Sequence, residues 1–145
     1  KEHENWPDLQ TRSHLNFMPG WCAGAPGIGL SRIDPLKHFP EDSDLGEDLN
    51  KAIAAVKNHT QYSTDHICCG RAGQISFLYE AGRIEEARTL AQGQLERMQT
   101  KGVWDLHNRL STPILPGLMG GVSGIGLTLL ALGGNKEPSR PWILA

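Results

Sequence analysis

Glycine and apolar residues recur along this chain in a pattern that appears three times. Three ten-residue stretches align without gaps, each with glycine at its first and fourth positions: GAPGIGLSRI from Gly24, GRAGQISFLY from Gly70 and GVSGIGLTLL from Gly121. Their starts lie 46 and 51 residues apart. Apolar residues follow the glycines at helical spacing, so the pattern predicts three apolar helices that each begin at a glycine.

The segments between the copies have one polar and one apolar face. Residues 43–59 predict an amphipathic helix that Ser43 or Asp44 would cap. Its apolar stripe is Leu45, Leu49, Ile53 and Val56. Residues 83–100 predict a more charged helix, whose buried stripe is Ile84, Ala87, Leu90, Ala91 and Leu95. Each repeat therefore pairs an apolar inner helix with an amphipathic outer helix. Pairs that recur every 40 to 50 residues or so predict an all-α fold, either a solenoid or a closed α/α ring.

Composition limits the classes of function. The chain has 145 residues, which suits one domain or a piece of a longer protein. Its 14 basic and 16 acidic residues give a net charge of −2, which indicates neither nucleic acid nor a membrane surface as a partner. No run approaches the roughly 18 apolar residues of a transmembrane helix, and the polar N-terminus is unlike a signal peptide. Three cysteines do not suggest a disulfide framework, which favours a reduced, cytoplasmic setting.

All three cysteines stand just before the first glycine of a repeat. Cys22 and Cys68 lie two residues before it, Cys69 lies one residue before it, and the third copy has Met119 at the position of Cys22. Because neighbouring repeats stack side by side, loop residues at equal offsets are expected to converge. A helix N-terminus is also expected to lower the pKa of a thiol. Three convergent thiolates predict a zinc site with one open position, which is typical of catalytic zinc. The alternative is three small buried side chains.

Two residues beside the cysteines are candidates for a catalytic role. His66 lies two residues before Cys68. It is expected to transfer protons or to support the metal ligands, since direct ligation would require the loop to double back. Trp21 precedes Cys22 and is either a lid over the site or a packing residue in the loop.

The motifs GWCAGAPGIGL, CCGRAGQISFLYEAGR and PGLMGGVSGIGLTLLAL together resemble those of the lanthionine synthetase C-like cyclases. The similarity covers essentially all of residues 1–145 and is greatest to the C-terminal cyclase domain of the bifunctional class II lanthipeptide synthetases. NWPDLQ near the start and PSRPWILA at the end take part in it. The resemblance implies an α/α toroid of seven inner and seven outer helices, of which this chain would hold about three pairs as the last part of a longer protein. It implies Zn²⁺ ligation by Cys22, Cys68 and Cys69, in the Cys-Cys-Gly form known for relaxed substrate choice.

The reaction that the resemblance implies is lanthionine ring closure. A cysteine thiol of a precursor peptide, kept as a thiolate by zinc, adds to the β-carbon of a dehydroalanine or dehydrobutyrine. The implied partners are the dehydrated precursor peptide and the remainder of the synthetase, namely the upstream cyclase helices and the dehydratase domain. The family's acid/base histidine lies on an inner helix upstream of the first cysteine motif, and we expect that helix to be missing here. A chain with three of seven repeats is expected to expose apolar surface such as Ile28, Ile75 and Leu127.

Two other classes of function remain open. A non-catalytic, zinc-stabilised repeat module that binds a peptide or protein partner would hold zinc in a closed site with four ligands. An α/α-toroid enzyme of another chemistry, such as a glycosidase or terpene cyclase, would need carboxylates that face inward. The acidic residues here cluster in EDSDLGED and IEEAR, on the predicted outer elements, which argues against that class.

Overall fold

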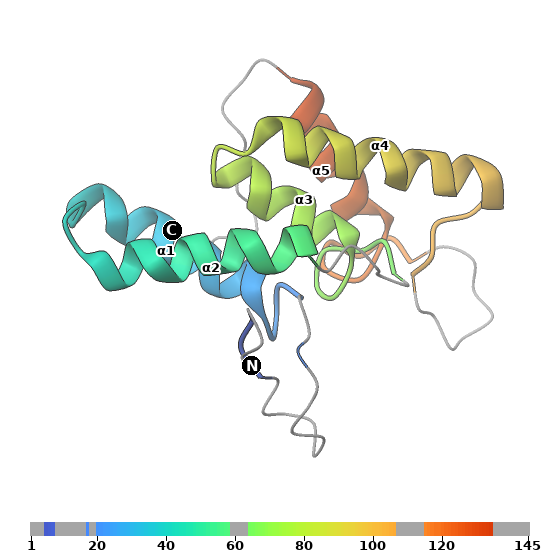
Figure 1. Ribbon diagram of the computed structural model, residues 1–145. Coiled ribbons are helices and arrows are strands. Elements are labelled where there is room, and N and C mark those ends of the chain that lie inside the picture. The colour runs from blue at the N-terminus through green and yellow to red at the C-terminus, as the bar shows by residue number, and fades with distance from the viewer. Residues whose placement is uncertain (1–4, 8–16, 18–19, 59–63, 107–114, 135–145) are drawn as a thin grey trace.

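A computed structural model describes residues 5–7, 17, 20–58, 64–106 and 115–134 (Figure 1). Within these residues the chain forms five α-helices and no β-strand, which confirms the predicted all-α fold. The helices are α1 (Ala25–His38), α2 (Ser43–Asn58), α3 (Arg71–Glu80), α4 (Ile84–Lys101) and α5 (Val122–Gly133).

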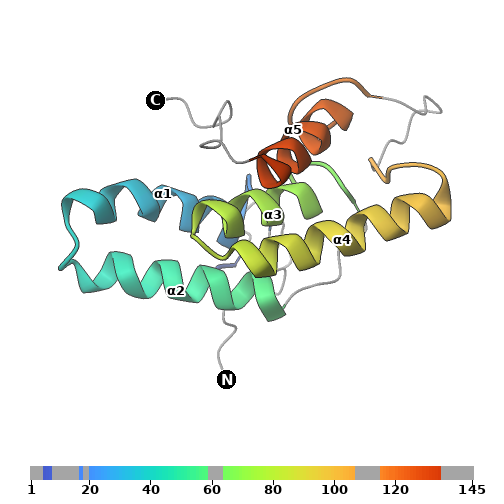
Figure 2. The same cartoon turned by 90° about the horizontal axis from the view of Figure 1, so that it is seen from above.

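The helices lie in two layers. The inner helix α3 contacts α1 on one side and α5 on the other, while α2 packs on α1 and α4 packs on α3 and α5. Seen from above, α1, α3 and α5 follow one another along one side of the molecule, and α2 and α4 lie along the other (Figure 2). This alternation of inner and outer helices agrees with the predicted α/α toroid. An outer helix after α5 would fall on residues 135–145, which lie outside the described residues.

Each inner helix begins directly after the first glycine of its repeat. The N-cap residues of α1, α3 and α5 are Gly24, Gly70 and Gly121. The second position of each repeat requires glycine for a steric reason. A Cβ atom there would overlap the carbonyl oxygen of the residue six positions earlier. The overlapping pairs are Gly27 with Trp21, Gly73 with Ile67, and Gly124 with Leu118. The loop therefore folds back against the first turn of the helix in all three copies, and only glycine leaves room for it.

The outer helices are bounded differently. The carboxylate of Asp42 accepts hydrogen bonds from the main-chain N–H groups of Asp44 and Leu45, both at 3.1 Å. Asp42 is therefore the cap of α2, and the prediction of Ser43 or Asp44 was wrong, because α2 begins at Ser43 and the capping side chain must precede the first helical residue. α4 ends at Lys101 and is closed by Gly102, whose φ of 72° lies in the left-handed region common after helices.

The centre of the core is α3, in which every residue from 72 to 78 is buried. The ring of Phe77 packs so closely on α1 that a Cβ atom at Gly29 would overlap it. Ile75 is fully buried, so the prediction that it lies on an exposed face was wrong: α1 and α5 cover α3 on both sides. Ile28 and Leu127 are partly buried. Leu130 of α5 is 75% exposed.

Candidate metal centre

Main-chain hydrogen bonds join the loops that precede α1, α3 and α5. The N–H of Cys22 donates to the carbonyl oxygen of Cys68 at 3.2 Å, and the N–H of Cys68 donates to that of Met119 at 2.9 Å. These three residues stand at the same offset before their glycines. The hydrogen bonds therefore connect matching positions of the three repeats, which confirms that the loops converge. The backbone itself holds the loops in register.

This ladder of hydrogen bonds brings the three thiols together. The Sγ atom of Cys69 lies 3.2 Å from Sγ of Cys22 and 3.4 Å from Sγ of Cys68. All three sulfur atoms lie within 4.8 Å of one another. Cys68 and Cys69 are partly buried, whereas Cys22 is exposed. The group can hold a metal ion and is accessible from the side of Cys22.

The electrostatics of the thiols differ from the expectation. Burial raises the pKa of both Cys68 and Cys69, and the neighbouring thiols raise that of Cys69 further. The prediction that a helix N-terminus lowers their pKa was wrong, because the loss of hydration among three crowded thiols outweighs the helix dipole. In the absence of a cation, Cys68 and Cys69 are therefore protonated at neutral pH. A metal ion supplies the positive charge that turns such thiols into thiolates.

Two side chains of the same loop hold the main chain of Cys69. Oγ1 of Thr64 donates to the carbonyl oxygen of Cys69 at 3.0 Å, and Nδ1 of His66 accepts the N–H of Cys69 at 3.3 Å. Acceptance at Nδ1 assigns the ring proton of a neutral imidazole to Nε2. Both side chains are buried. This contact fits the supporting role predicted for His66, while its role in proton transfer stays a prediction.

Trp21 packs between the helices beside the cysteine loops. Its partly buried side chain contacts two hydrophobic clusters, one that contains Phe77 and one that contains Ile125. Its Cβ atom also lies 3.5 Å from the position that a Cβ atom at Gly73 would take. These contacts fit the packing alternative. A catalytic role for Trp21 stays a prediction.

Sequence reasoning overlooked Thr64 and Asp65, both of which are buried in the loop before α3. A comparison of the three repeats could have drawn attention to this loop. The first copy has Pro19-Gly20 and the third has Pro116-Gly117 where the second has Asp65-His66. Proline stiffens a loop covalently by fixing φ, so the second copy must hold its loop by other means. A polar pair that replaces Pro-Gly in only one copy therefore marks a loop with additional contacts.

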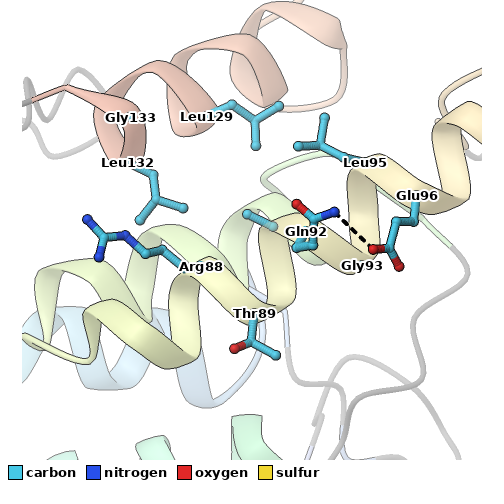
Figure 3. A pocket seen from close by; sticks show the side chains of 10 residues that line it. Arg88, Thr89, Gln92, Gly93, Leu95, Glu96, Leu129, Leu132 and Gly133 are labelled. Atoms are coloured by element: carbon cyan, nitrogen blue, oxygen red, sulfur yellow. Dashed lines mark hydrogen bonds between the residues drawn. The ribbon is translucent and has the colours of Figure 1, made fainter.

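A groove with a volume of about 870 Å³ lies elsewhere, between α4 and α5. Leu129 and Leu132 of α5 face Leu95 and Arg88 of α4 across it (Figure 3). A hydrogen bond of 2.9 Å joins Gln92 and Glu96 on its α4 side. None of the cysteines lines this groove, so the candidate chemistry at the helix N-termini is separate from it.

The fold and the site define a helical-repeat protein whose adjoining loops assemble three cysteines into a group that can hold a metal ion. A family model described as lanthionine synthetase C-like protein matches residues 1–145. The chain therefore belongs to the lanthionine synthetase C-like family. Neither the comparison with curated proteins nor that with solved structures gives a match. In the described part of the chain, no helix is long and apolar enough to cross a membrane.

Proposed function

We propose that this protein is a zinc-dependent lanthipeptide cyclase in which Cys22, Cys68 and Cys69 hold the zinc. The observation that carries the proposal is the convergence of three thiols within 4.8 Å in a chain of this family. The substrate is a dehydrated precursor peptide. A bond forms between a peptide cysteine sulfur and the β-carbon of a dehydroalanine or dehydrobutyrine, the carbon–carbon double bond is lost, and the α-carbon gains a proton in place of the thiol proton.

The three thiols suit zinc in chemistry and in spacing. In a tetrahedral site with Zn–S bonds of about 2.3 Å, neighbouring sulfur atoms lie about 3.8 Å apart. The observed separations of 3.2 and 3.4 Å and the 4.8 Å limit of the group bracket that value, so small side-chain rotations suffice. Among the described residues no fourth histidine, cysteine or carboxylate belongs to the group. In this proposal the fourth position takes the thiol of the substrate.

Zinc bound here would keep the thiol of a peptide cysteine as a thiolate at neutral pH. The chain's own residues define where that thiol can approach. Cys22 is exposed while Cys68 and Cys69 are partly buried, so the peptide would arrive over Cys22. The buried imidazole of His66 and the hydroxyl of Thr64 both hydrogen-bond the main chain of Cys69.

We further propose that residues 1–145 are the C-terminal part of the cyclase domain of a class II synthetase that works in the cytoplasm. Upstream cyclase helices would then supply the acid/base histidine, and a dehydratase domain would supply the dehydrated peptide. The motifs around Cys22, Cys68 and Gly121 support this assignment. Proton transfer by His66 is tested by the variant His66→Gln, which should retain zinc and lose ring closure only if the imidazole carries a proton to or from the substrate.

Metal analysis of the full-length protein tests the site. One zinc per chain is expected, and each of Cys22→Ala, Cys68→Ala and Cys69→Ala should lose most of it. Met119→Leu is the matched control, because Met119 stands at the equivalent position of the third repeat and should leave the zinc content unchanged. Undiminished zinc in any cysteine variant would remove that residue from the site.

Ring closure is followed on a dehydrated precursor peptide by alkylation of its remaining thiols, because cyclisation consumes a thiol without changing the peptide mass. The three cysteine variants should leave every thiol open to alkylation. The same assay separates a cyclase from a non-catalytic repeat module. The module would show zinc that does not exchange its fourth ligand with added thiols, and no loss of peptide thiols.

A further inference from the structure

Asp65 carries a buried carboxylate in the loop before α3. The residue is 1% exposed and lies three residues before Cys68. Its Oδ1 accepts a hydrogen bond from Nη2 of Arg97 in α4 at 3.0 Å. Its Oδ2 accepts the main-chain N–H of Asp105, in the segment after α4, at 2.8 Å. Two oxygens of one carboxylate thus tie the cysteine loop to two other parts of the chain.

The main chain of Asp65 adds three more hydrogen bonds. Its N–H donates to the carbonyl oxygen of Asp105 at 2.7 Å. Its carbonyl oxygen accepts from the N–H of Ala72 at 3.2 Å and from Nε2 of the fully buried Gln94 at 2.8 Å. The residue therefore connects α3, α4 and the segment after α4 at a single point. Flanking residues transmit this anchoring to the thiols, since Thr64 and His66 both hydrogen-bond the main chain of Cys69.

The charged environment of Asp65 favours a carboxylate at this position over a neutral side chain. The side chain of Asp65 is 2% exposed and that of Arg97 is 27% exposed, so the ion pair is largely shielded from water. Burial lowers the pKa of Arg71 at the start of α3, and the nearby Arg97 lowers it further, while Asp65 raises it. Two guanidinium groups thus share the field of one buried carboxylate. A neutral residue at position 65 would leave two like charges facing each other at the base of the loop.

We propose that Asp65 is a positioning residue, which holds the loop with Cys68 and Cys69 in the geometry that zinc binding requires. The proposal rests on the zinc site proposed above. Comparison of the repeats gives independent support. The other two copies have Pro-Gly at this point of the loop, and they contribute one thiol and none, respectively. The copy that supplies two ligands is the one in which a buried ion pair replaces the stiffening proline.

The test uses full-length protein from which the metal has been removed and to which zinc or cobalt is returned. Asp65→Asn keeps the shape of the side chain and removes its charge. Asp105→Asn is the matched control, because it makes the same change in the same network, but its carboxylate pairs with Lys101 at the surface, 3.3 Å away. Zinc affinity is measured by competition with a chelating indicator. The absorption bands of bound cobalt report the coordination geometry, which a general loss of stability would not alter.

Asp65→Asn should weaken zinc binding at least tenfold, within the 10- to 100-fold range typical of residues that support metal ligands. It should also change the cobalt bands, whereas Asp105→Asn should match the wild type in both. Arg97→Gln removes the partner and should reproduce the effect, so it decides the matter if Asp65→Asn does not fold. Wild-type affinity and bands in both Asp65→Asn and Arg97→Gln would overturn the proposal, as would an equal loss in Asp105→Asn. A wild-type protein that binds no metal would instead overturn the proposed function.

Discussion

The second glycine of the middle repeat, Gly73, gives the sharpest test of how the fold builds the site. A Cβ atom there would overlap the carbonyl oxygen of Ile67, the residue directly before Cys68, and its other side is in contact with the Cβ atom of Trp21. The overlapping atom belongs to the backbone, so it cannot move aside by changing a rotamer. Gly73→Ala must therefore displace the cysteine loop or the first turn of α3.

The expected loss of stability follows from two opposing terms. Alanine in place of glycine within a helix contributes about 1 kcal/mol of stabilisation. Overpacking of a buried site typically costs about 1 to 3 kcal/mol, and a rigid backbone contact belongs at the upper end of that range. Gly73→Ala should thus lower the free energy of unfolding by about 2 kcal/mol, as measured by urea denaturation followed by circular dichroism. A chelator should also remove its zinc faster than from the wild type.

Two control variants separate these effects. Gly126→Ala in α5 places its Cβ in open space, so it should gain roughly 0.5 to 1 kcal/mol and leave zinc release unchanged. Gly29→Ala overlaps the ring of Phe77 in the core and does not meet the cysteine loops, so it should lose stability without faster zinc release. If Gly73→Ala is as stable as Gly126→Ala, or if its zinc leaves no faster than from Gly29→Ala, the steric account of the loop is wrong.

Three further predictions concern the thiols. Cys69→His replaces one thiolate ligand by a neutral imidazole, which makes the set of zinc ligands less negative. The variant should retain zinc, and its ring closure should slow by roughly tenfold, equivalent to about 1.4 kcal/mol of barrier. An unchanged rate on one dehydrated peptide would show that the charge of the ligands does not set the reactivity. Because the pKa values of Cys68 and Cys69 are raised, zinc must displace their protons when it binds. Zinc affinity should therefore rise between about pH 6 and pH 8, and calorimetry in two buffers should detect the released protons. A zinc affinity that does not change with pH would contradict this prediction. In the metal-free chain, the same raised pKa values make the free energy of unfolding depend on pH. Their contribution is fully present below the ordinary thiol pKa of about 8.5 and is lost as the pH rises past it. Urea denaturation at several alkaline pH values measures this loss, with a chain lacking both thiols as the control.

The parts of the fold that repeat could be predicted from the sequence. Glycines at fixed offsets located the starts of α1, α3 and α5, because a close backbone approach permits no other residue and so leaves a mark in the sequence. The amphipathic stripes located α2 and α4 for a similar reason. The cap of α2 was missed by one or two residues, since Asp42, Ser43 and Asp44 are all good capping residues and only geometry selects among them.

The energetics of the site could not be predicted in the same way. Offsets in the sequence indicate that Cys22, Cys68 and Cys69 converge, but not how much water their sulfur atoms lose on convergence. The raised pKa of Cys68 and Cys69 follows from that lost hydration. The partners of Asp65 could not be predicted for a related reason: Arg97 and Asp105 lie 32 and 40 residues away along the chain. The burial of Ile75 likewise depends on two helices that flank α3 in space.

The two adjacent cysteines, Cys68 and Cys69, have different places in the repeat structure. The backbone ladder joins one residue from each copy, Cys22, Cys68 and Met119, and so treats the three repeats alike. Cys69 lies outside the ladder, directly before the N-cap of α3, yet its sulfur lies 3.2 Å from that of Cys22 and 3.4 Å from that of Cys68. The symmetric part of the structure therefore positions the loops, and a local departure from symmetry in the second copy creates the three-thiol group. The same copy carries Asp65 and His66 in place of Pro-Gly, and in the role proposed above Asp65 anchors the loop that carries two of the three thiols.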